Sequence, residues 1–135
     1  MDAIYWDASA ILSLLFRDRH AAMAQNYARD GIAHLASSLT IAELHAAFAR
    51  ARRSHRTEAL GDVEKRLARG PWKYLIDSPS RAIIRDLAPK CALKGADLWH
   101  LALAKTLNAE RSGLRLLSFD AKLVEAARAE GLSAI

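Results

Sequence analysis

The sequence predicts an α/β fold in which a parallel sheet of about five strands lies between helices on both of its faces. Short apolar runs of strand length alternate along the chain with longer segments whose apolar residues recur at helical spacing. This alternation is typical of a parallel sheet that is covered on both faces. The 135 residues contain no repeat, low-complexity segment or long linker, so we expect one domain over residues 1–135.

The first half of the chain contains two expected strands, each followed by helix. A short β-prone run predicts a strand at residues 3–6. Apolar residues at helical spacing predict a helix at residues 10–17, and an Ala-rich segment predicts another at residues 21–29. The apolar run at residues 32–36 is typical of a buried strand, and residues 40–53 then place their apolar side chains on one face of a long helix.

The second half alternates in the same way, and several of its segments end at Gly or Pro. The expected elements are a helix at residues 58–68, a strand at 72–76, helices at 80–87 and 97–108, a strand at 114–117, a helix at 120–130 and a last strand at 132–135. Ligands of open parallel sheets bind outside the carboxyl ends of the strands. Residues that directly follow a strand are therefore the first candidates for a functional site.

Composition narrows the function classes. Apolar residues make up 52% of the chain, which excludes disorder, and the longest apolar stretches are too short to cross a membrane. Asp2 and Asp7 stand where a basic secretory leader would begin. Cys91 is the only cysteine, so an internal disulfide and a zinc cluster are excluded, and we expect a cytoplasmic protein with no membrane partner.

The net charge of +5 points to a polyanionic partner, and the excess is concentrated in one segment. Residues 50–73 hold eight basic and three acidic side chains. The basic ones are Arg50, Arg52, Arg53, Arg56, Lys65, Arg66, Arg69 and Lys73. Such a run is either a solvated helix face or a stripe that contacts phosphates, and the charge alone favours the solvated face.

Four carboxylates occupy the same kind of position. Asp7 and Asp120 come directly after expected strands, Glu43 lies in the expected first turn of the helix at 40–53, and Asp97 begins another helix. Each has a purely structural interpretation. Asp7 and Asp120 could be N-caps, Glu43 could close a capping box with Thr40, and Asp97 could oppose its helix dipole.

Taken together, the four acids favour a different interpretation. A parallel sheet brings these junctions to one edge, where four carboxylates repel one another strongly. They can spread into water, hold protons at raised pKa values, or bind a cation. Oxygen ligands of this kind suit Mg²⁺ or Mn²⁺ and not zinc. A metal bound beside a basic stripe predicts metal-assisted phosphodiester cleavage.

Four motifs give the sequence a recognisable resemblance. They are Trp6-Asp7-Ala-Ser9, Thr40-Ile-Ala-Glu43-Leu, Gly95-Ala-Asp97-Leu-Trp-His100-Leu-Ala and Leu117-Ser118-Phe-Asp120. In order and spacing the chain resembles the PIN-domain ribonucleases, and most closely the VapC-type toxins of type II toxin–antitoxin pairs. The resemblance implies the PIN-like three-layer fold. It also implies that Asp7, Glu43, Asp97 and Asp120 are the catalytic, Mg²⁺-binding acids, with the hydroxyls of Ser9 and Ser118 beside them.

The resemblance further implies an endoribonuclease that cuts structured RNA and leaves a 5′-phosphate and a 3′-hydroxyl. Its implied partners are a cognate antitoxin, the RNA substrate and a second copy of the chain in a homodimer. Within the basic stripe we expect Arg50, Arg52, Arg53 and Arg56 to contact RNA.

Two other functions stay open. One is a non-catalytic module that binds protein or RNA, with the acids acting as helix caps. The other is a phosphatase with Asp7 as nucleophile, but such enzymes need a second aspartate two residues later, where this chain has Ser9. His100 shares a helix face with Asp97, and we interpret it as a structural histidine more readily than as a metal ligand or substrate contact.

Overall fold

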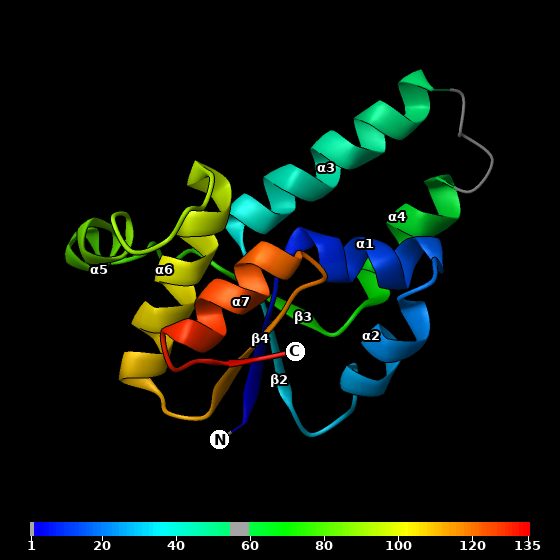
Figure 1. Ribbon diagram of the computed structural model, residues 1–135. Coiled ribbons are helices and arrows are strands. Elements are labelled where there is room, and N and C mark those ends of the chain that lie inside the picture. Colours follow the sequence, from blue (N-terminus) through cyan, green and yellow to red (C-terminus); the bar gives the residue numbers. More distant parts are fainter. Residues whose placement is uncertain (1, 55–59) are drawn as a thin grey trace.

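A computed structural model describes residues 2–54 and 60–135 and contains a five-stranded, fully parallel sheet. Its strands are β1 (Ala3–Trp6), β2 (Ala33–Ser37), β3 (Trp72–Leu75), β4 (Leu114–Leu117) and β5 (Ser133–Ala134). They lie in the order β3-β2-β1-β4-β5 (Figure 1). The predicted fold class is confirmed, and the expected strands at 3–6 and 114–117 have the predicted bounds.

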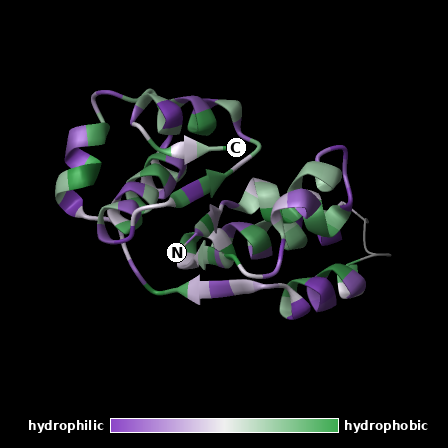
Figure 2. Cartoon of the chain, turned by 90° about the horizontal axis from the view of Figure 1, so that it is seen from below, coloured by the Kyte–Doolittle hydropathy of each residue, from purple (hydrophilic) through white to green (hydrophobic). Residues whose placement is uncertain are grey.

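Helices cover both faces of this sheet. They are α1 (Ala8–Phe16), α2 (Ala21–Tyr27), α3 (Ser38–Arg53), α4 (Leu60–Arg69), α5 (Arg81–Leu87), α6 (Gly95–Glu110) and α7 (Ala121–Ala129). Helices α1 to α4 contribute to one apolar core and α5 to α7 to the other. In Figure 2 the helices on both sides of the sheet carry hydrophilic and hydrophobic residues in alternating bands, as expected for amphipathic helices. None of the described helices is long and apolar enough to cross a membrane.

Strand β1 is buried on both faces. Ile4 and Trp6 point into one core and Tyr5 into the other, and all three side chains are fully buried. The Trp6 ring meets the ring of Trp72 edge to face, with 5.5 Å between their centroids. Gly70 makes room for the Trp72 ring, since a Cβ at that position would lie 2.1 Å from a ring carbon. Polar groups on this central strand must therefore find partners inside the protein.

The strand order places a switch point at β1. The chain steps from β1 to β2 and β3, and then returns past β1 to pair β4 with its other edge. Sheets of this kind bind ligands at the carboxyl end of the strands beside the switch point. Trp6 is in register with Leu117, so the next residues, Asp7 and Ser118, emerge together at that edge. The topology alone thus brings two of the four motifs into contact.

Three helices begin two residues earlier than predicted. The helix expected at 10–17 begins at Ala8 because Asp7 caps it, the helix expected at 40–53 begins at Ser38, and the helix expected at 97–108 begins at Gly95. The second shift has a clear cause: the Ser37 hydroxyl accepts the Thr40 N–H at 3.1 Å and so acts as the N-cap. Residues 58 and 59 of the helix expected at 58–68 lie outside the described residues.

Candidate active site

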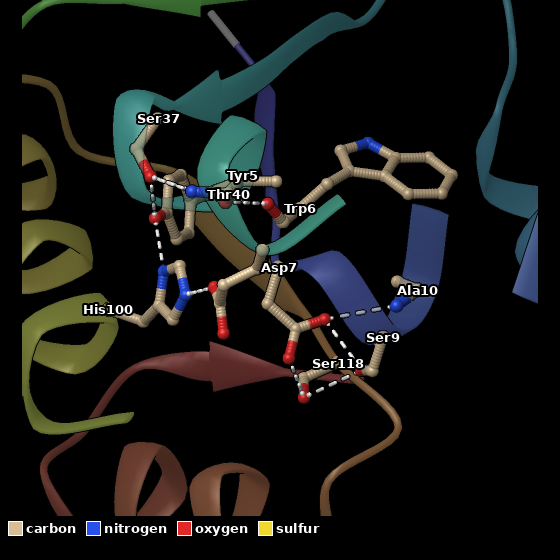
Figure 3. Close-up of polar contacts among 10 residues, drawn as sticks. Tyr5, Trp6, Asp7, Ser9, Ala10, Ser37, Thr40, His100 and Ser118 are labelled. Carbon is tan, nitrogen blue, oxygen red and sulfur yellow. Dashed lines mark hydrogen bonds and ion pairs between the residues drawn. The ribbon is translucent and has the colours of Figure 1, made fainter. Parts of the chain in front are cut away.

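Asp7 lies at the centre of the switch point and is only 5% exposed. Its Oδ1 accepts the Ala10 N–H at 3.0 Å and the Ser9 hydroxyl at 2.7 Å, and its Oδ2 accepts the Ser118 hydroxyl at 2.6 Å (Figure 3). The predicted N-cap role of Asp7 is confirmed. Burial raises the pKa of Asp7, although its three hydrogen bonds and the nearby His100 act in the opposite direction. Asp7 is therefore a rigid carboxyl group whose charge is poorly compensated.

Ser9 and Ser118 connect the start of α1 to the segment that follows β4. The Ser9 oxygen accepts the Phe119 N–H at 2.9 Å, and the Ser118 oxygen accepts the Asp120 N–H at 3.0 Å. Each hydroxyl thus donates to Asp7 and accepts from the β4–α7 connection. Ser9 lies beside Asp7, where the resemblance placed it. Ser118, two residues before Asp120, also contacts Asp7, so the two serines hold the last acidic motif next to the first.

The structure corrects the prediction that Glu43 closes a capping box with Thr40. Because α3 begins at Ser38, Glu43 lies in its second turn, beyond reach of a first-turn cap. Glu43 Oε1 instead lies 2.5 Å from Nε2 of His100 on α6. The Glu43 side chain is 34% exposed, so it lies at the mouth of the site.

Asp97 and Asp120 complete the group at the other side of the switch point. Asp97 lies in the first turn of α6, as predicted. Asp120 is the N-cap of α7 and accepts the N–H groups of Lys122 and Leu123 through Oδ1 at 2.9 and 3.2 Å, which confirms its predicted cap role. Burial raises the pKa of Asp97, and the negative charges of Asp120, Asp7 and Glu43 raise it further. The other three carboxylates are therefore close enough to Asp97 for their charges to disfavour its ionised form.

Their side chains do not form a ready-made metal cage. Within residues 2–54 and 60–135, no three His, Cys, Asp or Glu side chains are arranged to hold a metal ion. Asp7 accepts hydrogen bonds from the Ser9 and Ser118 hydroxyls, and Glu43 Oε1 contacts His100. Asp97 and Asp120 instead line a hollow of about 340 Å³. Lys94 and Lys122 line the same hollow, so positive and negative groups share one opening.

The site also contains residues that the sequence reasoning did not assign to it. His100 is 1% exposed and touches both Glu43 and Tyr5, which in turn contacts Ser37. The interpretation of His100 as a structural histidine therefore missed its contact with Glu43. The only local signal was the Asp97-x-x-His100 spacing, which places the two residues on neighbouring positions of one helix face.

The basic stripe leads away from this site along α3. Arg50 lies seven residues, or about 10 Å, beyond Glu43 on the same helix face, and its side chain is exposed. Arg53 is also exposed, whereas Arg52 forms an ion pair with Glu64 on α4. Arg56 lies outside the described residues. The end of α3 projects beyond the body of the protein (Figure 1).

A comparison with known protein families shows to which family the chain belongs. The family model described as PIN domain matches residues 4–129, which include all four acids. The chain belongs to the PIN-domain family. No curated protein sequence matches it significantly.

Solved structures support the PIN fold. PAE2754 from Pyrobaculum aerophilum is 24% identical and superimposes with a TM-score of 0.65, covering 98% of this chain and 83% of that chain. VapBC2 from Rickettsia felis, solved bound to a DNA fragment from their promoter, is 10% identical with a TM-score of 0.69, covering 98% and 97%. VapBC-1 from nontypeable Haemophilus influenzae is 18% identical with a TM-score of 0.62, covering 98% and 96%. At these identities the likeness shows a shared fold.

Proposed function

We propose that this PIN domain is a Mg²⁺-dependent endoribonuclease that acts as the toxin of a toxin–antitoxin pair in the cytoplasm. One observation carries the proposal: Asp7, Glu43 and Asp120 lie close enough to Asp97 for their negative charges to act on it. Neighbouring carboxylates in a chain of net charge +5 are understandable if a cation completes the group.

The donor set fits a hard divalent ion. Carboxylate oxygens are the ligands that Mg²⁺ and Mn²⁺ prefer, and a bound ion of this kind polarises a phosphoryl oxygen and lowers the pKa of a water molecule. Asp7 is held by three hydrogen bonds and would be the fixed ligand, and Asp97, Glu43 and Asp120 would provide further oxygens. Lys94 and Lys122 line the hollow beside Asp97 and would attract the phosphates of a bound strand.

The proposal includes two protein partners, an antitoxin and a second copy of the chain. It is supported by the resemblance to VapC-type toxins and by the similarity of the fold to VapBC2 and VapBC-1. Light scattering of the purified chain tests the homodimer, and a strictly monomeric mass would refute it.

Cleavage of a pool of structured RNAs tests the enzymatic function. We expect the purified chain to cut RNA in Mg²⁺ or Mn²⁺ and to be inactive in EDTA, because the acids alone cannot activate water or approach a phosphate. The products should carry 5′-phosphate ends. Equal cleavage in EDTA would refute the metal mechanism. A folded protein that neither cuts RNA nor gains thermal stability from the metal would favour the non-catalytic binding module.

We also propose that Arg50 and Arg53 guide RNA to the site. Both are exposed, and Arg50 lies on the helix face that carries Glu43. The double variant Arg50→Glu, Arg53→Glu should bind RNA more weakly, and its dependence on salt concentration should decrease by about one unit of slope for each lost phosphate contact. Filter binding at several salt concentrations measures both quantities. Unchanged affinity and slope would show that these arginines form only a solvated face.

A further inference from the structure

His100 bridges the two helices that carry the acids on this side of the site. It lies on α6, three residues after Asp97, and its Nε2 reaches Oε1 of Glu43 on α3 at 2.5 Å. His100 is 1% exposed, whereas Glu43 is 34% exposed. A buried ring thus holds the end of a long side chain that otherwise faces solvent.

The other ring nitrogen joins a buried chain of hydroxyl groups. His100 Nδ1 lies 2.5 Å from the Tyr5 hydroxyl, and the Tyr5 hydroxyl donates to Ser37 Oγ at 2.9 Å (Figure 3). Ser37 also contacts Thr40 Oγ1 at 3.2 Å. These contacts connect α6 with the middle strand of the sheet and with the start of α3.

The direction of each hydrogen bond follows from the end of this chain. The Thr40 hydroxyl donates to the Trp6 carbonyl, which can only accept. Ser37 therefore donates to Thr40, and Tyr5 donates to Ser37. The Tyr5 oxygen is left to accept from the Nδ1–H of His100. The backbone carbonyl of β1 thus fixes the hydrogen on Nδ1 and the orientation of the ring. The contact between Nε2 and the Glu43 carboxylate then needs a second hydrogen, held on Nε2 and donated to Oε1.

His34 shows what a purely structural histidine looks like in this protein. It is 2% exposed, accepts the Trp6 Nε1–H at 3.1 Å and contacts the Arg29 carbonyl at 2.8 Å. Both of its ring nitrogens are satisfied, and neither contact involves an acid. The two histidines share burial and full hydrogen bonding, so the feature that distinguishes His100 is its contact with Glu43.

We propose that His100 is a positioning residue, which holds the Glu43 carboxylate beside Asp97 so that its remaining oxygen is available to a divalent cation. The inference rests on the proposed metal-dependent function. Glutamate loses substantial rotamer freedom when it is fixed, and without His100 the half-exposed side chain would spread into water. A hydrogen-bond partner that orders the Glu43 side chain before the cation arrives strengthens cation binding, because less conformational entropy is then lost on binding.

Two substitutions separate this role from simple filling of the core. In His100→Gln the amide nitrogen can reach the Nε2 position and still donate to Glu43. In His100→Asn the shorter amide reaches only the Nδ1 position, toward Tyr5. Titration calorimetry of the full chain with Mn²⁺ alone should show a Kd about 10-fold or more higher for the Asn variant, while the Gln variant keeps most of the affinity.

The control and the double variant make the test decisive. His34→Asn removes a comparable buried ring, so it should lower Tm as His100→Asn does while leaving the Mn²⁺ affinity unchanged. In a Glu43→Gln background, His100→Asn should have no further effect on Kd. Unchanged or tighter Mn²⁺ binding by His100→Asn would overturn the positioning role and leave the metal site intact. A wild-type chain that binds no Mn²⁺ would overturn the proposed function together with this inference.

Discussion

Replacing Asp97 with asparagine is expected to reduce metal-dependent RNA cleavage more than about 100-fold, a larger loss than removal of a residue that only supports a ligand. Burial raises the pKa of Asp97, and the negative charges of Asp120, Asp7 and Glu43 raise it further, so Asp97 lies within electrostatic reach of all three acids. Asparagine keeps the size of the side chain but removes the negative charge that a divalent ion requires. The fold should survive because the side chain is only partly buried, in the first turn of α6.

The measurement is single-turnover cleavage of a labelled RNA in Mn²⁺, with near-ultraviolet circular dichroism to verify folding. Asp86→Asn is a matched control, because it changes the net charge by the same amount on an exposed side chain of α5 that pairs with Lys90. We expect the control to cleave at the wild-type rate. Cleavage by Asp97→Asn within a few-fold of the wild type would remove Asp97 from the catalytic group.

The elements of the fold could be predicted where local pattern and tertiary environment agree. Strand β1, and strand β4 apart from Arg115, are apolar because both faces are largely buried, and the same property marks them in the sequence. The start of α3 was predicted two residues late because Thr40 fits a capping box equally well on local grounds. Ser37 becomes the cap because β2 continues through it and positions its hydroxyl beside Thr40. Local rules cannot distinguish these two starts.

In the candidate site, the acids could be predicted from the sequence but the residues that support them could not. The four acids were selected by their positions after expected strands and at helix starts, and the resemblance then assigned them to the metal site. The parallel register of Trp6 and Leu117 explains why Asp7 lies beside the segment that leads to Asp120. The supporting residues could not be found in this way. The contacts of His100 with Tyr5 and Glu43 span 95 and 57 residues along the chain. Nothing near His100 in the sequence indicates those two partners, and its apolar neighbours favour a core role.

Asp7→Asn is expected to stabilise the metal-free protein while it removes the response to metal. Burial raises the pKa of Asp7 above its ordinary value of 3.8, so the folded chain retains this proton to higher pH than the unfolded chain. The free energy of unfolding therefore falls as pH rises from the ordinary carboxyl pKa through the raised one, and the deficit persists at pH 7. Asparagine has no charge to bury, and its oxygen can still accept from Ala10 and Ser9.

Thermal unfolding in EDTA at pH 7 should give a higher Tm for Asp7→Asn than for the wild type, by about 3–5 °C for each 1 kcal/mol that the neutral side chain adds to the free energy of unfolding. The difference should shrink as pH falls through the raised pKa and below 3.8, where the wild-type carboxyl group is protonated in both states. Added Mn²⁺ should raise the Tm of the wild type and of Asp86→Asn, but much less that of Asp7→Asn. If Asp7→Asn is instead the less stable protein in EDTA at pH 7, the three hydrogen bonds to the Asp7 carboxylate outweigh its burial. The acid would then be a structural cap that folding favours, and the argument that its uncompensated charge calls for a cation would fail.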